Sequence, residues 1–198
     1  MDWSHFLQPG TVAAGILEAV AVLFGLASVW FMKKESILAF PFGIINVLVY
    51  VVIFVTAGLY ANAAINGYFF FMSIFGWYNW SRRSGEVQVV RIGRCSSRER
   101  ILNLLVIILL FLLIRHLLER YTESDVPGWD AATTAVYMVA QWLLSRKKIE
   151  NWLLWISADV VMTGLCAWQG LYFSSFQYAV FTVIAVLGFR EWRRKLSR

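Results

Sequence analysis

The sequence predicts an all-α membrane protein with seven transmembrane helices, and three observations lead to this fold class. Of the 198 residues, 60% are hydrophobic and only 15% are charged, against roughly 45 to 50% and 25% in soluble domains. Long apolar runs without alternation recur along the chain, and in lipid such runs form helices because each backbone polar group must be paired inside its own segment. The basic residues stand at the ends of these runs.

Seven apolar segments can cross the roughly 30 Å of hydrocarbon in a bilayer. We expect helices over residues 11–32, 36–56, 59–80, 101–118, 129–144, 152–168 and 171–189. Pro41 falls near the start of the second segment, where the missing N–H does no harm. The fourth, fifth and sixth segments are shorter than the roughly 20 residues of a full span, so flanking residues must complete them.

The basic residues predict the orientation of these helices. If the N-terminus lies outside, all but Arg115 and Arg120 of the 18 lysines and arginines lie on the inner side. Basic loops stay in the cytoplasm, so the chain is expected to be N-out and C-in. The net charge of +6 is spread over helix ends and therefore indicates topology rather than nucleic-acid binding.

An internal repeat relates the first three helices to the last three. At a constant offset of 112 residues, Trp30 matches Trp142, Gly58-Leu59-Tyr60 matches Gly170-Leu171-Tyr172, and Gly76, Trp80 and Arg82 match Gly188, Trp192 and Arg194. Three helices end on the side opposite to their start, so the fourth must restore the orientation. The sequence thus predicts one membrane domain with a 3+1+3 parallel repeat: 11–80, an inner linker and linking helix over 81–118, and 129–192.

The sixth segment carries the strongest candidate site. Trp152, Trp155 and Asp159 are spaced i, i+3, i+7 and share one helical face. Two indoles and a carboxylate in an apolar helix attract a flat, positively charged solute. Alternatively, the tryptophans anchor the membrane interface and the aspartate only packs. The other polar candidates at depth are Asn46, Asn66, Gln141, Gln177 and Tyr178.

Other features are assigned simpler roles. Trp80 and Trp192 stand at expected water boundaries, where indoles collect. Cys95 and Cys166 fall on opposite sides of the membrane and are expected to be free thiols. The arginine-rich segment 81–100 serves as the inner linker or binds anionic headgroups.

The chemistry of an enzyme is not expected from this sequence. His5 and His116 have no partner at metal-ligand spacing, so no metal site is expected. No phosphate loop, no nucleophile beside a base and no pair of carboxylates at catalytic spacing is evident. We therefore expect neither catalysis nor a cofactor.

These motifs together resemble the PnuC family of bacterial vitamin transporters. The family signature is Trp-x-x-Trp followed four residues later by Asn or Asp, and here it reads Arg146-Lys147-Lys148-Ile149-Glu150-Asn151-Trp152-x-x-Trp155-x-x-x-Asp159. Further matches are Pro41-x-Gly43-Ile44-Ile45-Asn46-Val47-Leu48, Leu59-Tyr60-Ala61, Gly76-Trp77-Tyr78-Asn79-Trp80 and Gly188-x-x-x-Trp192. The resemblance covers nearly the whole chain.

The resemblance implies a 3+1+3 fold related to the SWEET carriers and a homotrimer in the bacterial inner membrane. It also implies facilitated uptake of nicotinamide riboside for NAD biosynthesis, with a cytoplasmic kinase that phosphorylates and so traps the solute. Carried over by position, Trp152, Trp155 and Asp159 contact the substrate. Asn46 and Asn66 would lie beside them, although relatives have Gln where this chain has Asn66.

The mechanism expected from the repeat is alternating access, in which two three-helix units rock around a central site. Thiamin is the closest alternative substrate because its thiazolium is also a flat cation. Related subfamilies carry riboflavin or deoxynucleosides. A membrane-embedded enzyme or receptor is a more distant alternative.

Overall fold

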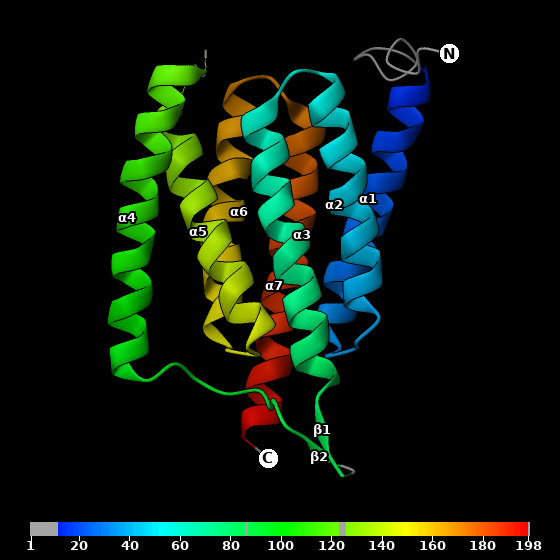
Figure 1. Ribbon diagram of the computed structural model, residues 1–198, viewed down its shortest axis with the longest axis vertical. Helices are drawn as coiled ribbons and strands as arrows, with labels where there is room; N and C mark the ends of the chain where they lie inside the picture. The colour runs from blue at the N-terminus through cyan, green and yellow to red at the C-terminus, as the bar shows by residue number, and fades with distance from the viewer. Residues whose placement is uncertain (1–11, 86, 123–125, 198) are drawn as a thin grey trace. The chain divides into compact units, whose positions relative to one another are not determined.

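The computed structural model describes residues 12–85, 87–122 and 126–197. The chain folds into two compact units, Met1–Val89 and Val90–Arg198. The described residues form seven α-helices and one short antiparallel hairpin (Figure 1). The prediction of seven helices is therefore confirmed.

The first unit is a three-helix bundle followed by the hairpin. Its elements are α1 (Val12–Lys33), α2 (Ala39–Thr56), α3 (Tyr60–Ser81), β1 (Arg83–Ser84) and β2 (Val87–Gln88). In this bundle α2 packs against both α1 and α3. Buried Ser28 of α1 donates a hydrogen bond of 2.8 Å to the carbonyl of Ala39, so a polar contact as well as apolar packing joins α1 to α2.

The second unit is a chain of four helices in which each packs against the next. They are α4 (Ser97–Tyr121), α5 (Pro127–Ser145), α6 (Glu150–Trp168) and α7 (Tyr172–Leu196). Buried Cys95, Val139 and Leu143 form a core cluster near α4 and α5. No residue of α4 itself is buried, so most of the apolar surface of this helix is available to lipid or to another protein.

Four helices, α4 to α7, are longer than the sequence predicts, and α4 and α7, with 25 residues each, exceed their predicted ranges by the most. A capping box fixes the start of α4: the Ser96 hydroxyl accepts from the Glu99 N–H, and the Glu99 carboxylate accepts from the Ser96 N–H. The last turn of α7 contains Arg193, Arg194 and Lys195, whose positive charges favour a helix C-terminus. Polar residues therefore extend both helices beyond their apolar runs.

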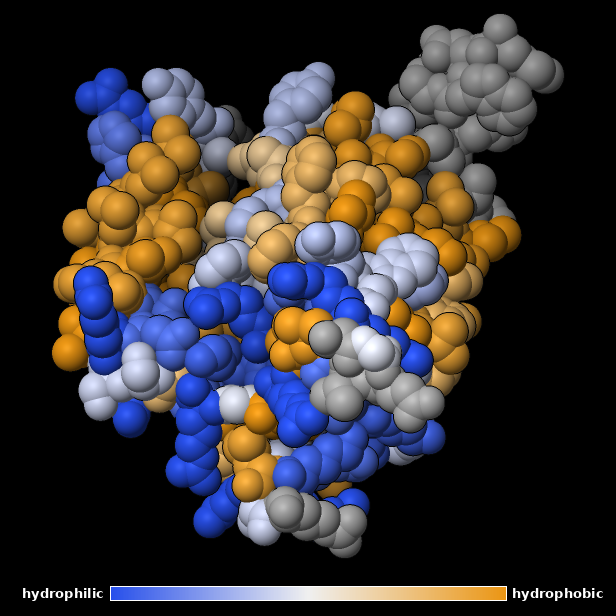
Figure 2. Space-filling view, turned by 60° about the horizontal axis from the view of Figure 1, so that its bottom comes forward, coloured by the Kyte–Doolittle hydropathy of each residue, from blue (hydrophilic) through white to orange (hydrophobic). Residues whose placement is uncertain are grey.

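Four helices are long and apolar enough to cross a membrane by length and composition. They are Gly15–Lys33, Ala39–Thr56, Ser97–Tyr121 and Tyr172–Leu196. Figure 2 shows hydrophobic side chains along the helix flanks and hydrophilic ones gathered at the helix ends that come forward. This distribution is that of a multi-pass membrane protein.

The two units share backbone features at the offset of 112 residues. Gly58 has φ 75° and Gly170 has φ 76°, and each lies in the turn before the third helix of its set. Glu35 and Lys147 have φ 60° and 52°, backbone angles that residues other than glycine rarely adopt. The turns between successive helices are therefore built alike in the two units.

An aromatic pair is also shared at the same offset. Phe40 and Trp80 meet edge to face with ring centroids 5.0 Å apart, and Trp152 and Trp192 do so at 5.5 Å. Trp80 and Trp192 are buried, so each indole packs inside its own unit, and their place at the water boundary stays a prediction. Both pairs are T-shaped, an arrangement that the aromatic quadrupole favours over a face-to-face sandwich.

Candidate substrate site in the second unit

Three side chains of α5 and α6 form a polar and aromatic cluster. The Tyr137 hydroxyl donates a hydrogen bond of 2.7 Å to the Asp159 carboxylate. The Tyr137 ring also lies 5.1 Å from the Trp155 ring, tilted by 35°. One phenol therefore holds both a carboxylate and an indole in place, and we call these three residues the Trp155 cluster.

Asp159 is the acidic residue of this cluster. Its exposed fraction is only 3%, and taking an ionised carboxylate out of water costs several kcal/mol unless a partner offsets the loss. The Tyr137 hydroxyl supplies one hydrogen bond. A cationic ligand beside the carboxylate would supply the opposite charge, and the neighbouring indole face attracts cations as well.

Further polar residues lie close to the cluster. Gln141 is buried and stands one helical turn after Tyr137 on the same face of α5. Tyr178 of α7 is near enough to Tyr137 for the two phenols to interact electrostatically. Gln177 precedes Tyr178 on α7 and is partly buried. The structure thus brings Gln141 and Tyr178 towards the cluster that the sequence placed on α6.

Trp152 has a different environment from Trp155. Its exposed fraction is 1%, its ring and that of Trp192 form a T-shaped pair, and a Cβ added to Gly188 would lie 2.7 Å from its ring atoms. Among the described residues its indole nitrogen has no hydrogen-bond acceptor. In this structure Trp152 is a packing residue between α6 and α7, whereas Trp155 is only partly buried.

The two asparagine candidates belong to the first unit. Asn46 of α2 donates through its amide nitrogen to the carbonyl of Ala21 in α1 at 2.7 Å. Asn66 of α3 donates to the carbonyl of Asn62, one turn earlier in its own helix, at 3.0 Å. In this unit Asn46 joins two helices, and the part that both asparagines take in substrate binding stays a prediction.

Sequence reasoning missed Tyr137, which contacts the two candidate residues Trp155 and Asp159 of α6. The available signal was its position four residues before Gln141 in an otherwise apolar helix, which puts two polar side chains on one face. That pattern does not reveal the bond to Asp159, because the contact depends on how α5 packs against α6.

The N-terminal end of α6 is held by the segment that precedes α4. Gly93 pairs with the α5–α6 turn through two backbone hydrogen bonds, from its N–H to Lys147 at 3.0 Å and from the Ile149 N–H to its carbonyl at 2.9 Å. The Cys95 N–H donates to both carboxylate oxygens of Glu150 at 3.0 Å. Burial, with Glu150 beside it, raises the pKa of the Cys95 thiol to about 11.

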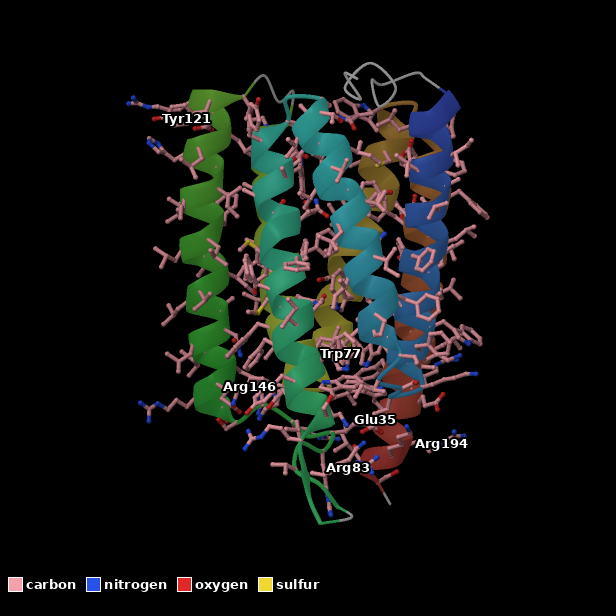
Figure 3. The ribbon with its side chains drawn as sticks, turned by 45° about the vertical axis from the view of Figure 1, so that its right-hand side comes forward. Glu35, Trp77, Arg83, Tyr121, Arg146 and Arg194 are labelled. Atoms are coloured by element: carbon pink, nitrogen blue, oxygen red, sulfur yellow. The ribbon has the colours of Figure 1, made fainter. Side chains whose placement is uncertain are left out.

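An ion-pair network completes this attachment. Lys148 donates to the carbonyl of Arg94 at 3.1 Å and to the carboxylate of Glu99 at 2.9 Å. Arg146 lies 3.3 Å from the other Glu99 oxygen, and Figure 3 shows it at the lower end of the unit. We call these contacts and those of Gly93 and Cys95 the linker clamp. Because the clamp includes the first turn of α6, it positions the helix that carries Trp155 and Asp159.

A multi-pass helical protein with a buried carboxylate and aromatic rings fits the class of membrane transporters for small solutes. The family model described as nicotinamide mononucleotide transporter matches residues 15–194. The chain belongs to this family of PnuC-type transporters.

Individual relatives agree with this assignment. The chain is 30% identical to the nicotinamide riboside transporter PnuC of Escherichia coli, over 89% of this chain and 84% of that protein. It is 24% identical to the riboflavin/roseoflavin transporter RibM of Streptomyces davaonensis, over 61% of this chain and 58% of that protein. The fold is similar to the crystal structure of the vitamin B3 transporter PnuC, with a TM-score of 0.72 and 23% identity, over 91% of this chain and 81% of that one.

Proposed function

We propose that this protein carries nicotinamide riboside across the membrane by facilitated diffusion. The observation that carries the proposal is the buried Asp159 carboxylate, bonded to Tyr137 and adjacent to the Trp155 ring. Nicotinamide riboside presents a flat pyridinium cation, which suits an indole face and a desolvated carboxylate. The name of the Escherichia coli relative agrees with this solute.

Each candidate site residue of the second unit has a proposed role. Trp155 stacks on the pyridinium, Asp159 supplies the opposite charge, and Tyr137 orients that carboxylate. Gln141, Gln177 and Tyr178 offer hydrogen bonds to ribose hydroxyls. Trp152 supports the site from behind by holding α7 against α6.

We further propose that the chain forms a 3+1+3 parallel repeat, SWEET-like and N-out/C-in. The shared turns and aromatic pairs at an offset of 112 residues support the repeat, and the distribution of basic residues supports the orientation. Transport by alternating access in the bacterial inner membrane belongs to the same proposal.

Two partners are proposed as well. The exposed apolar side chains of α4 suit contact with lipid or with neighbouring subunits of a homotrimer. A cytoplasmic kinase would phosphorylate the solute after entry, and the added charge would prevent its return. Light scattering of the purified protein in detergent tests the trimer, and a mass of one subunit would contradict it.

Calorimetric titration of the purified protein with nicotinamide riboside, thiamin and riboflavin tests the solute. We expect nicotinamide riboside to bind most tightly and riboflavin, which lacks a fixed cation, to bind weakly. Tighter binding of thiamin would assign the same cationic site to the alternative vitamin. If riboflavin bound most tightly, the charge-based choice of solute would be wrong.

Uptake into proteoliposomes separates transport from catalysis or reception. Radiolabelled nicotinamide riboside should accumulate only to its external concentration and should be recovered chemically unchanged. A converted product inside the vesicles would favour a membrane-embedded enzyme, and binding without uptake would favour a receptor.

A further inference from the structure

The second unit contains a basic pocket that shares no residue with the Trp155 cluster. Its volume is about 840 Å³, and it is lined by Arg94, Arg190, Arg193, Arg194, Leu196 and Ser197. We call it the arginine pocket. Figure 3 shows Arg194 at the lower end of α7, beyond the apolar part of that helix.

Packing of α7 fixes the direction of three of these arginines. They are spaced i, i+3 and i+4, which places them on one face of the helix. Gly188 and Trp192 lie on the opposite face, where they pack against Trp152 of α6. Since both packing residues are buried, the helix cannot rotate freely, and its arginine face stays outward.

Arg94 reaches the pocket from a different part of the chain. Its carbonyl accepts a hydrogen bond from Lys148 at 3.1 Å, and the linker clamp holds Gly93 and Cys95 on either side of it. Basic residues at a helix C-terminus are expected from the helix dipole alone. That explanation covers the arginines of α7 but not Arg94, which the clamp brings to the same place.

The charges of the pocket are not balanced by its own residues. None of the residues that line it is acidic, and in the described ranges none of its four guanidinium groups forms an ion pair with a carboxylate. Glu99, the acid of the nearby clamp, is already paired with Arg146 and Lys148. Four like charges facing one cavity repel one another, and an anion removes that repulsion.

We propose that the arginine pocket binds a phosphate-bearing anion. The planar guanidinium donates two parallel hydrogen bonds to phosphate oxygens, which makes arginine the preferred residue for this recognition. The volume lies within the roughly 300 to 1,000 Å³ of small-molecule sites and exceeds the needs of one phosphate ion. The ligand is therefore either the headgroup of an anionic phospholipid or a soluble diphosphate.

Two binding measurements on the full-length protein in detergent distinguish the sources. Native mass spectrometry compares retention of phosphatidylglycerol with that of phosphatidylcholine, and calorimetry measures binding of inorganic pyrophosphate. The pocket variant is Arg94→Gln/Arg194→Gln. The matched control is Arg98→Gln/Arg100→Gln, which removes the same charge from exposed arginines outside the pocket. Arg94→Lys/Arg194→Lys keeps the charge but loses the paired donors.

The pocket variant should bind its ligand at least about tenfold more weakly than the parent, whereas the control should stay within about twofold. The lysine variant should fall between them, and high salt should weaken binding in the parent. Retention of phosphatidylglycerol alone identifies a lipid, pyrophosphate binding alone identifies a soluble ligand, and either supports the site. The proposal is overturned if neither ligand binds, or if the pocket and control variants lose affinity equally.

Discussion

Gly188 shows how one residue without a side chain sets the packing of two helices. An added Cβ would lie 2.7 Å from the Trp152 ring, closer than non-bonded carbon atoms approach. The indole cannot move away easily, because Trp192 packs against it. A match of Gly76 and Trp80 with Gly188 and Trp192 was visible in the sequence, but its meaning as a packing motif was not.

We therefore expect Gly188→Ala to destabilise the protein by about 1 to 3 kcal/mol through overpacking. The matched control is Gly164→Ala on α6, where nothing lies within 4 Å of the added carbon, and this change should be neutral or stabilise by about 0.4 to 1 kcal/mol. Unfolding in detergent followed by circular dichroism measures both. Equal stability of the two variants would contradict the close contact.

Replacing Tyr137 with Phe removes the hydrogen bond to Asp159 and leaves the ring in place. Loss of a hydrogen bond to a charged group should cost about 1.5 to 3 kcal/mol of stability, and the affinity for nicotinamide riboside should fall. Tyr121→Phe is the control, because that side chain is 76% exposed. Removing its hydroxyl should change the free energy of unfolding by less than about 0.5 kcal/mol. If both phenylalanine variants match the parent in stability and binding, Tyr137 does not orient Asp159.

The thiol of Cys95 predicts a pH dependence of stability. Its pKa in the folded protein is raised from 9.0 to about 11, so between these values the unfolded chain loses a proton that the folded chain keeps. The contribution of this thiol is therefore complete below about pH 9 and is lost as the pH rises towards 11. Stability should fall more steeply over this window in the parent than in Cys95→Ser, and parallel curves would show that the thiol pKa is not raised.

At the scale of elements, the start of α4 and the start of α6 are joined by the linker clamp. Glu99 takes part in both, since it caps α4 through Ser96 and accepts from Lys148 of the α5–α6 turn. The apolar runs predicted where both helices lie. They did not predict the clamp, because Glu99 and Lys148 are 49 residues apart in sequence and meet only after packing. The earlier start of α4 did have a local signal, since Ser96 and Glu99 have the spacing of a capping box.

Glu99→Gln should loosen the clamp without unfolding the helices. Amide exchange at residues 93–100 should become roughly fivefold faster, as expected for loss of a helix cap and its attached charges. Glu119→Gln is the matched control, because Glu119 forms an exposed i, i+4 pair with Arg115, and such pairs contribute little. Unchanged exchange in Glu99→Gln would show that backbone contacts alone hold the linker.

At the scale of the whole molecule, composition and apolar runs were enough to predict a multi-pass helical membrane protein and its seven helices. The motif around Trp152, Trp155 and Asp159 was enough to indicate the family. The different environments of the two tryptophans were not predictable, since only the packing of the helices buries Trp152 and leaves Trp155 partly exposed. Tyr137 was missed for the same reason.

Binding of nicotinamide riboside to two tryptophan variants of α6 tests the proposed site most directly. Trp155→Ala should weaken binding roughly tenfold through loss of a cation–π contact. Trp168→Ala removes the same side chain at a position that is 76% exposed and should bind like the parent. If a folded Trp155→Ala protein binds nicotinamide riboside as tightly as the Trp168→Ala control, the solute does not bind at the Trp155 cluster.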